Sequence, residues 1–165
     1  MKKGKGSFIK GCKERGEWAE LCFMARAVQH GFSVSRRYGD SSAYDVGVED
    51  NGRFSRVQVK SVTFFRVKSY TCNVVGPKHE RYRSGRLEFF AVYLVPIDLW
   101  YVIPFEVVKN NLSLNLAPHL RGHKFAQYME AWHLMSGDGV RANAREGGRD
   151  RTARLKAPSH VRGRR

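Results

Sequence analysis

The amino-acid sequence predicts a single α/β domain, and three observations indicate this fold class. Residues 16–30 carry apolar side chains at helical spacing, which predicts an amphipathic helix. The dipeptide Asn51-Gly52, the strongest short signal for a β-hairpin, separates two strand-like segments. Two apolar segments, residues 88–95 and 99–103, predict a further pair of strands. A chain of 165 residues suits one such domain.

The predicted helix is followed by two short strands. Its apolar positions share one face and are Trp18, Leu21, Cys22, Ala25 and Val28. Gly31 follows as a natural C-terminal stop. Residues 32–37 predict a strand, and the glycine, aspartate and serines of residues 38–42 predict a loop. Residues 43–49 then alternate between polar and apolar positions, which predicts a half-buried strand.

The Asn51-Gly52 turn fixes the register of the hairpin that it closes. A two-residue loop pairs the residues that flank it, and each step outward keeps the sum of the two residue numbers constant. Asp45 is therefore expected opposite Gln58 on the partner strand, residues 53–62. Opposed residues have Cβ atoms about 4.5–5.5 Å apart, and Lys60 shares the face of Gln58 as a diagonal neighbour of Asp45. We expect these three polar side chains to converge on one patch.

The charge balance indicates a nucleic-acid partner. The chain holds 30 Lys or Arg against 15 Asp or Glu, which gives a net charge of +15 and an isoelectric point near 10.2. Basic side chains that contact phosphates release condensed counterions, and this release supplies most non-specific affinity. No membrane partner is expected, because the longest apolar run is broken by prolines and no lipidation motif is present. The missing signal-peptide core and three cysteines without a CxxC pair predict a cytoplasmic location.

Beyond the hairpin, the sequence predicts a basic loop and a final helix. Residues 70–75 predict a strand, and residues 76–86 predict a loop that faces solvent or DNA. The cations of this loop that we expect to bind nucleic acid are Lys78, Arg81, Arg83 and Arg86. Residues 122–135 place Phe125, Tyr128, Met129 and Trp132 at helical spacing, which predicts an amphipathic helix.

Composition divides the chain into three parts. Residues 1–15 form a basic N-terminal segment, residues 16–136 the folded domain, and residues 137–165 a basic tail. From Arg141 onward the chain holds nine Lys or Arg against two acidic residues. Few large apolar residues are available there to offset the entropy of ordering, so the tail is expected to be disordered. It is either a DNA-binding arm or a dispensable extension.

The patch expected at Asp45, Gln58 and Lys60 holds the groups that phosphodiester hydrolysis needs. That reaction uses an activated water and a cation that neutralises charge on the reacting phosphate. Asp45 supplies a carboxylate, Gln58 a neutral carbonyl oxygen, and the backbone carbonyl of Val59 could join them. Oxygen ligands of this kind suit Mg²⁺. Lys60 would stabilise negative charge and orient or deprotonate the attacking water.

Several blocks of sequence follow one another in an order that is typical of a known family. The first blocks are Gly16-Glu17-Trp18-Ala19-Glu20, Tyr38-Gly39-Asp40, Tyr44-Asp45-Val46 and Arg56-Val57-Gln58-Val59-Lys60-Ser61. The later blocks are Glu88-Phe89-Phe90-Ala91-Val92-Tyr93, Trp100-Tyr101-Val102-Ile103-Pro104, and Tyr128 with Ala131-Trp132-His133-Leu134. Together they closely resemble the PD-(D/E)xK endonucleases associated with group I introns. The resemblance covers residues 16–135.

This resemblance implies a fold, an activity and a set of site residues. The fold is a restriction-endonuclease-like α/β core, in which a central mixed sheet is flanked by helices, and residues 16–136 would be the nuclease domain. The activity is homing-endonuclease-like cleavage of double-stranded DNA with Mg²⁺ or Mn²⁺, by a homodimer or homotetramer. Asp45, Gln58 and Lys60 would be catalytic, and Asp45 and Gln58 would bind the metal together with a helix glutamate. Archaeal Holliday junction resolvases share this arrangement, so a junction resolvase is an alternative.

The helix glutamate is Glu17 or Glu20, which lie three residues apart on one helical face. Glu20 matches the resolvase-like pattern when counted back from the end of the helix, so it is favoured as the metal ligand, whereas Glu17 also suits a helix-start carboxylate. Glu88 opens its strand where the family often has an acid, and it is a further candidate. Gln58 stands where the wider superfamily usually has an acid. A catalytically inactive nucleic-acid-binding protein with the nuclease fold is therefore the other alternative.

Overall fold

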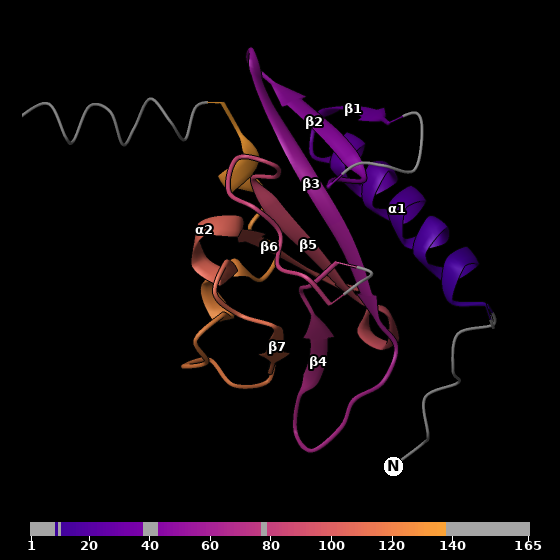
Figure 1. Cartoon of the computed structure of the whole chain (residues 1–165), viewed down its shortest axis with the longest axis vertical. Coiled ribbons are helices and arrows are strands. Elements are labelled where there is room, and N and C mark those ends of the chain that lie inside the picture. The colour runs from indigo at the N-terminus through magenta and orange to yellow at the C-terminus, as the bar shows by residue number, and fades with distance from the viewer. Residues whose placement is uncertain (1–8, 10, 38–42, 77–78, 138–165) are drawn as a thin grey trace, which may run out of the picture.

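The computed structural model describes residues 9, 11–37, 43–76 and 79–137, which build a five-stranded mixed sheet and its covering layers (Figure 1). The strands are β1 (Ser33–Arg36), β2 (Val46–Asp50), β3 (Arg53–Val62), β5 (Phe89–Leu94) and β6 (Leu99–Pro104), in the order β1-β2-β3-β5-β6. Strands β3 and β5 are parallel, and the other neighbours are antiparallel. The predicted α/β fold class with a central mixed sheet is confirmed.

Some predictions lie outside the described residues. These are the loop at residues 38–42, the cation Lys78, residues 1–8 and 10 of the N-terminal segment, and the basic tail from residue 138 onward. They remain predictions.

Helix α1 (Cys12–Gln29) begins four residues earlier than the predicted helix and ends where the glycine indicated. Gly31 takes a φ of 87°, a conformation that glycine adopts without a Cβ penalty. The N–H of Phe32 donates to the carbonyl of Ala27 and that of Gly31 to the carbonyl of Val28, which is the hydrogen-bond pattern of a Schellman cap. Within the described residues, no helix combines the length and the apolar character needed to span a membrane.

The β2–β3 hairpin has the predicted turn and register. Asn51 and Gly52 take φ values of 48° and 77°, as a type I′ turn requires, and Asp50 pairs with Arg53. The ladder continues to the pair Val46 and Val57. The partner strand occupies residues 53–62, as expected, whereas β2 begins at residue 46 rather than 43.

The two faces of the sheet are covered by different layers. Helix α1 packs Ala19, Phe23 and Ala27 against one face of the sheet. Every second residue of β2 and β3 points into this core, such as Val46 on β2 and Val57 on β3. The opposite face forms a second core with a small antiparallel sheet of β4 (Tyr70–Asn73) and β7 (Ser113–Leu116), and with helix α2 (Phe105–Val108). Figure 1 shows α1 on one side of β3 and the β4–β7 pair on the other. The sequence pattern predicted β4 but neither β7 nor α2.

The continuous helix predicted over residues 122–135 is wrong. Two short 3-10 helices, Ala126–Tyr128 and Trp132–Met135, stand there instead. Between them Glu130 takes a φ of 49° and its N–H donates to the carbonyl of Trp100, while its carboxylate accepts from the Trp100 N–H and from the Trp132 indole, both at 2.7 Å. This anchor lets the segment pass around β6, so that Phe125 packs in one core and Trp132 in the other.

Candidate active site

The Asp45 carboxylate stands where the β2–β3 ladder ends. Its backbone N–H still donates to the carbonyl of Val57 at 2.9 Å, one residue before β2 begins. Its Oδ2 accepts hydrogen bonds from the Val59 N–H at 2.8 Å and from Gln58 Nε2 at 2.5 Å. Because β2 supplies no further carbonyl at this point, the side chain of Asp45 takes over as the acceptor for β3. The hairpin register therefore brings Asp45 and Gln58 together.

Burial sets the electrostatics of this carboxylate. Loss of water raises the pKa of Asp45 above its usual value, although the Val59 N–H and the charge of Lys60 act in the opposite direction. Gln58 is 8% exposed and donates its amide N–H to Asp45, which leaves the amide carbonyl oxygen as the atom that can bind a cation. A raised pKa means that the surrounding groups do not fully stabilise the negative charge of the buried carboxylate. A divalent cation bound nearby would stabilise that charge.

Lys60 lies on the same face of β3 as Gln58. Its ammonium donates to the Tyr82 hydroxyl at 3.4 Å and lies 5.7 Å from the centre of the Tyr82 ring. Within the described part of the chain, Lys60 has no ion-pair partner. Its positive charge is therefore available to a negatively charged reactant beside Asp45.

Of the two helix glutamates, Glu20 is the one that is half-buried and pairs with the end of β1. Its carboxylate is half-buried and lies 3.4 Å from the Arg36 guanidinium, whereas Glu17 is exposed. Burial, followed by the negative charge of Asp45, raises the pKa of Glu20 above its usual value, while Arg36 acts against them. The negative charges of Glu20 and Asp45 repel each other, so these two carboxylates are close enough to interact.

Glu88 is engaged elsewhere. Its carboxylate forms an ion pair with the Arg56 side chain and accepts from the Arg56 backbone N–H at 2.7 Å. Burial alone would raise the pKa of Glu88, but the bonds from Arg56 outweigh it and lower the pKa below its usual value. Glu88 thus fastens the start of β5 to β3 and is not free to bind a metal.

The basic loop reaches the same side of the sheet as Lys60. Arg81, Arg83 and Arg86 are exposed, and Tyr82, between the first two, packs against the ring of Phe90 as well as against Lys60. The three arginines are therefore carried by a segment that contacts the candidate site.

Two residues that contact the site were missed by sequence reasoning. Arg36 ends β1 and pairs with Glu20, and Tyr82 holds Lys60 from an irregular loop. No periodicity or spacing marks either of them. Their roles depend on how β1 and the loop fold back on the sheet.

The donor set decides which metal could fit. Within the described residues, no three His, Cys, Asp or Glu side chains cluster in a way that could hold an ion. The oxygens at hand are those of Asp45, the Gln58 amide and the Val59 carbonyl, with Glu20 on the neighbouring helix. Such oxygens suit a hard cation that keeps several waters, as Mg²⁺ does, and they do not suit zinc.

This arrangement of helix, hairpin and mixed sheet places the protein in the class of restriction-endonuclease-like α/β folds. Residues 11–135 match the family model described as PD-(D/E)XK endonuclease. The chain belongs to the PD-(D/E)XK endonuclease family, as its sequence resemblance indicated. No curated protein matches the chain.

Two solved structures are similar to this one. The bacterial homing endonuclease I-Ssp6803I is 26% identical, with a TM-score of 0.70, over 81% of this chain and 98% of that chain. The Holliday junction resolvase Hjc of Archaeoglobus fulgidus is 14% identical, with a TM-score of 0.45, over 61% of this chain and 84% of that chain. The first match covers nearly the whole homing endonuclease and supports the assignment of this chain to a homing-endonuclease-like branch.

Proposed function

We propose that this protein is a homing-type DNA endonuclease, of the group I intron-associated kind, that hydrolyses phosphodiester bonds in double-stranded DNA with Mg²⁺ or Mn²⁺. The observation that carries the proposal is the buried Asp45 carboxylate, which Gln58 and Val59 hold beside Lys60. Membership of the PD-(D/E)XK endonuclease family and the similarity to a homing endonuclease support it. The net charge of +15 suits a DNA partner.

Asp45, Gln58 and Glu20 would hold the cation. The two carboxylates would supply charge and the Gln58 amide a neutral carbonyl oxygen. When bound, the cation neutralises charge on the reacting phosphate and favours ionisation of water. Asp45 must lose its proton first, because a protonated carboxyl is a poor ligand. Glu17, which is exposed, remains the second choice for the helix acid.

Lys60 would act on the attacking water and on the charge that develops at phosphorus. The water oxygen forms a bond to phosphorus, the bond from phosphorus to the leaving sugar oxygen breaks, and that oxygen takes up a proton. An ammonium held at this place stabilises the extra negative charge of the transition state. Tyr82 limits the positions that the Lys60 side chain can take.

The proposal includes an oligomeric state, a DNA-contacting loop and a cellular location. One site cuts one strand, so cleavage of both strands would need at least two protomers, in a homodimer or homotetramer. The exposed Arg81, Arg83 and Arg86 would contact DNA phosphates, together with Lys78. We place the protein in the cytoplasm, where DNA and reduced cysteines are both found.

A plasmid-nicking assay tests the proposal. The wild-type protein should cut supercoiled plasmid in Mg²⁺ and not in EDTA. Lys60→Ala should abolish cutting and leave DNA binding nearly intact, because it removes the water-orienting charge but leaves the basic loop. Lys109→Ala is the matched control, since Lys109 is paired with Glu106 at 2.6 Å on α2. Cutting by Lys60→Ala near the wild-type rate would contradict the mechanism.

A second candidate function is DNA binding without catalysis. The neutral Gln58, and the lack of a three-acid cluster among the described residues, favour it. It predicts salt-sensitive binding of plasmid with no metal-dependent cuts. Branched substrates separate a third outcome, because strong preference for four-way junctions over linear duplex would favour a junction resolvase.

A further inference from the structure

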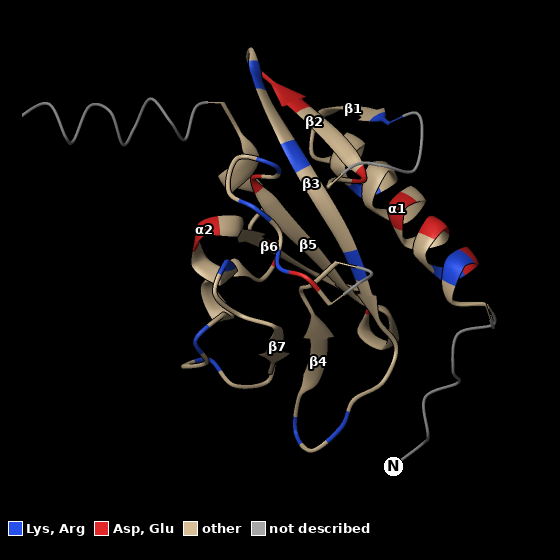
Figure 2. Cartoon of the chain, viewed as in Figure 1, with Lys and Arg blue, Asp and Glu red and all other residues tan. Residues whose placement is uncertain are grey.

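The part of the second layer that is built from β4, β7 and their connections carries basic side chains and no acidic ones of its own. Residues 61–76 and 107–129 contain no Asp or Glu, although the chain holds 15 of them. These segments build β4, β7 and their connections, and their cations are Arg66, Lys68, Lys109, Arg121 and Lys124, of which Lys109 is paired with Glu106 of the neighbouring α2. Figure 2 shows β4 and β7 in tan, and blue without red on the turn before β4 and on the loop after β7. The layer covers the sheet face that also carries Lys60, because Val62, two residues further along β3, packs in the same core as Tyr70 and Leu116.

The turn before β4 is strained, and its tip is exposed. Arg66 and Ser69 exchange both backbone hydrogen bonds, at 2.9 and 3.0 Å, so Val67 and Lys68 form a two-residue turn. Their φ values are 44° and 68°, where glycine or asparagine is normally required and a β-branched residue is a rare outlier. The Val67 residue is 97% exposed, so no contact within the protein compensates for this strain. Backbone strain that no internal contact compensates is typical of residues that bind a ligand or a partner.

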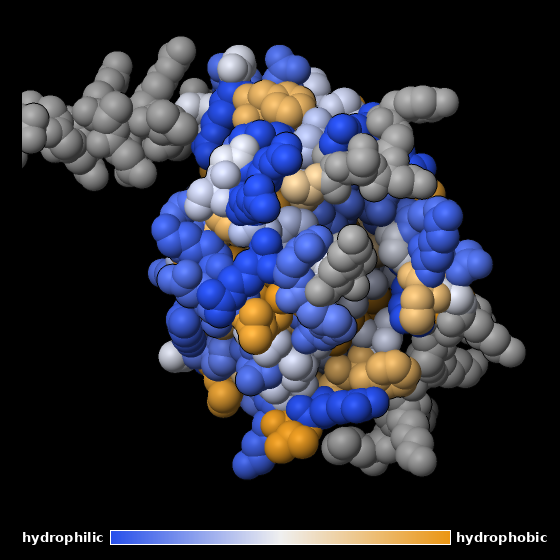
Figure 3. Space-filling model, in the orientation of Figure 1, coloured by the Kyte–Doolittle hydropathy of each residue, from blue (hydrophilic) through white to orange (hydrophobic). Residues whose placement is uncertain are grey.

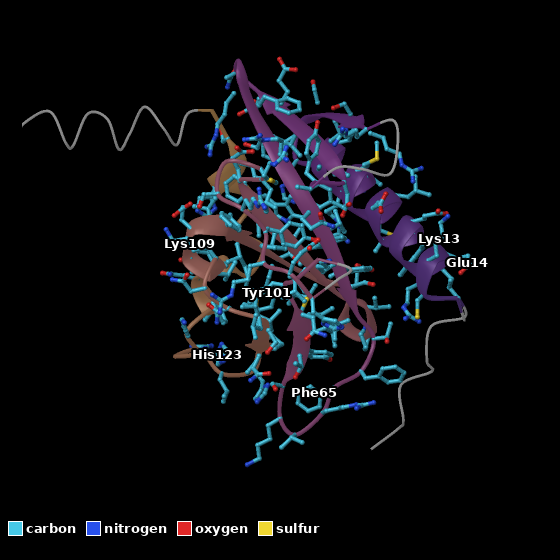
Figure 4. The ribbon with its side chains drawn as sticks, viewed as in Figure 1. Lys13, Glu14, Phe65, Tyr101, Lys109 and His123 are labelled. Carbon is cyan, nitrogen blue, oxygen red and sulfur yellow. The ribbon has the colours of Figure 1, made fainter. Side chains whose placement is uncertain are left out.

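Aromatic rings support the base of this turn. Phe64 and Phe65 are 60% and 49% exposed. The Arg66 guanidinium lies 5.9 Å from the centre of the Phe64 ring. The Phe65 ring contacts the rings of Tyr70 at 5.1 Å and His119 at 5.9 Å, which joins the turn to the loop before His123 (Figure 4). The lower end of Figure 3 shows hydrophobic and hydrophilic side chains side by side.

A hollow of about 290 Å³ lies beside the turn. Arg15 and Arg66 line it together with Ser61, Thr63 and Thr71. Its other lining residues, Val62 and Phe64, are apolar, so none of the described residues that line it is acidic. Arginine and hydroxyl donors around an acid-free hollow are the groups that bind phosphodiester oxygens.

We propose that residues 64–69 form a duplex-DNA contact separate from the catalytic centre, in which Arg66 and Lys68 contact phosphates and Val67 presses into a groove as an apolar wedge. The partner class rests on the proposed function. Apolar side chains at such tips fit between or against base steps, while neighbouring cations hold the backbone. A second copy of this chain fits less well, because docking two such tips would bring like charges together.

The tip lies within reach of the same duplex as Lys60. Arg66 lies six positions after Lys60, and an extended strand spans at most about 20 Å over that length. Base pairs are spaced about 3.4 Å apart along the helix axis, so this distance corresponds to roughly six base pairs. The tip would therefore contact DNA that flanks the cut phosphate.

The salt dependence of binding tests this contact. The probe is a fluorescein-labelled duplex of random sequence, bound by the full chain in Ca²⁺ and followed by anisotropy over a range of KCl concentrations. Arg66→Ala/Lys68→Ala should reduce the slope of log affinity against log salt by about 1.8, since each phosphate contact contributes about 0.9. Arg26→Ala/Lys109→Ala is the control. It removes the same charge from residues already paired with Asp98 and Glu106, so the slope should stay at the wild-type value.

Val67→Gly tests the wedge without changing charge. Glycine accepts the positive φ, so this variant should melt no lower than the wild type, bind the duplex more weakly and keep the wild-type salt slope. Wild-type affinity in Val67→Gly would overturn the wedge, and a slope in Arg66→Ala/Lys68→Ala equal to that of the control would overturn the contact. A change of oligomeric mass in sedimentation with unchanged DNA binding would also overturn it, in favour of a subunit interface. Binding is measured without cleavage, so these outcomes are independent of the plasmid-nicking result.

Discussion

The environment of Asp45 suits the binding of a cation, but it lowers the stability of the metal-free fold at neutral pH. Its carboxylate is buried, and its pKa is raised by burial despite the hydrogen bonds that it accepts. A group whose pKa is raised on folding favours the folded state in its protonated form. Its stabilising effect is complete below the pKa of the unfolded chain and is lost as the pH rises through the higher pKa of the folded chain.

Asp45→Asn should therefore stabilise the metal-free protein at neutral pH. The asparagine carbonyl can accept the hydrogen bonds of Gln58 and Val59 without a buried charge. Melting curves in EDTA should show a higher melting temperature for Asp45→Asn than for the wild type at pH 7. The difference should shrink as the pH falls below about 4, where the wild-type carboxyl is protonated in both states. An equal or lower melting temperature at neutral pH would show that the surrounding groups fully stabilise the negative charge of Asp45.

At the scale of residues, the sequence predicted which side chains are neighbours within one hairpin. It did not predict which side chains from different helices and strands lie together. The proximity of Asp45 and Gln58 followed from the turn residues, since the register of a two-residue hairpin is local. The choice between Glu17 and Glu20 depends on how α1 is rotated against the sheet. That rotation is set by the packing of Ala19, Phe23 and Ala27. The apolar face predicted from the sequence was wrong, because Leu21, Ala25 and Val28 are exposed.

The β2–β3 hairpin is the element on which the site depends. Its turn holds Gly52 at a φ of 77°, and no neighbouring atom lies close to the position that a Cβ would take there, so the backbone conformation alone demands glycine. A slip of one residue would turn Asp45 to the other face, away from Gln58.

Gly52→Ala should lower the free energy of unfolding by about 1 kcal/mol, because alanine resists a left-handed conformation. Gly16→Ala is the matched control. Gly16 lies inside α1 with open space around it, so the same substitution should raise the free energy of unfolding by about 0.5–1 kcal/mol. Urea denaturation measures both variants. Equal shifts of the same sign would contradict the assignment of the turn.

The final segment marks the limit of periodicity at the scale of elements. Phe125, Tyr128, Met129 and Trp132 have helical spacing, yet the chain turns at Glu130. Phe125 and Tyr128 pack on one face of the sheet and Trp132 on the other, while Met129 is exposed. A helical repeat of apolar residues predicts one buried face. It does not predict a segment that crosses the edge of a sheet and is fixed there by a carboxylate bound to Trp100.

At the scale of the whole molecule, the positive charge is unevenly distributed. Residues 138–165 hold nine Lys or Arg against three acidic residues, and the family match ends before them, at residue 135. The end of the described chain is held to the hairpin by Arg53, whose guanidinium donates to the carbonyls of Leu134 and Ser136 at 3.0 Å. Asp50 accepts from the Ser136 hydroxyl at 2.8 Å.

Removal of residues 138–165 should weaken DNA binding without weakening the fold. The truncated protein should keep the wild-type melting temperature, because the contacts of Arg53 and Asp50 are retained. Its affinity for a random duplex should fall and depend less on salt, since fewer cations contact phosphates. Anisotropy titrations at several KCl concentrations provide the measurement. Unchanged affinity and slope would identify the tail as a dispensable extension.

The sequence by itself determined the fold class, the hairpin register and the grouping of Asp45, Gln58 and Lys60, because turn chemistry and strand alternation act over a few residues. Only the tertiary structure decided that Glu20 rather than Glu17 is half-buried beside Arg36, that Arg56 engages Glu88, and that Tyr82 contacts Lys60. The same holds for the acid-free layer of β4 and β7, whose two segments are far apart in sequence. These features depend on long-range packing, and one chain read along its length does not reveal which distant surfaces are buried against each other.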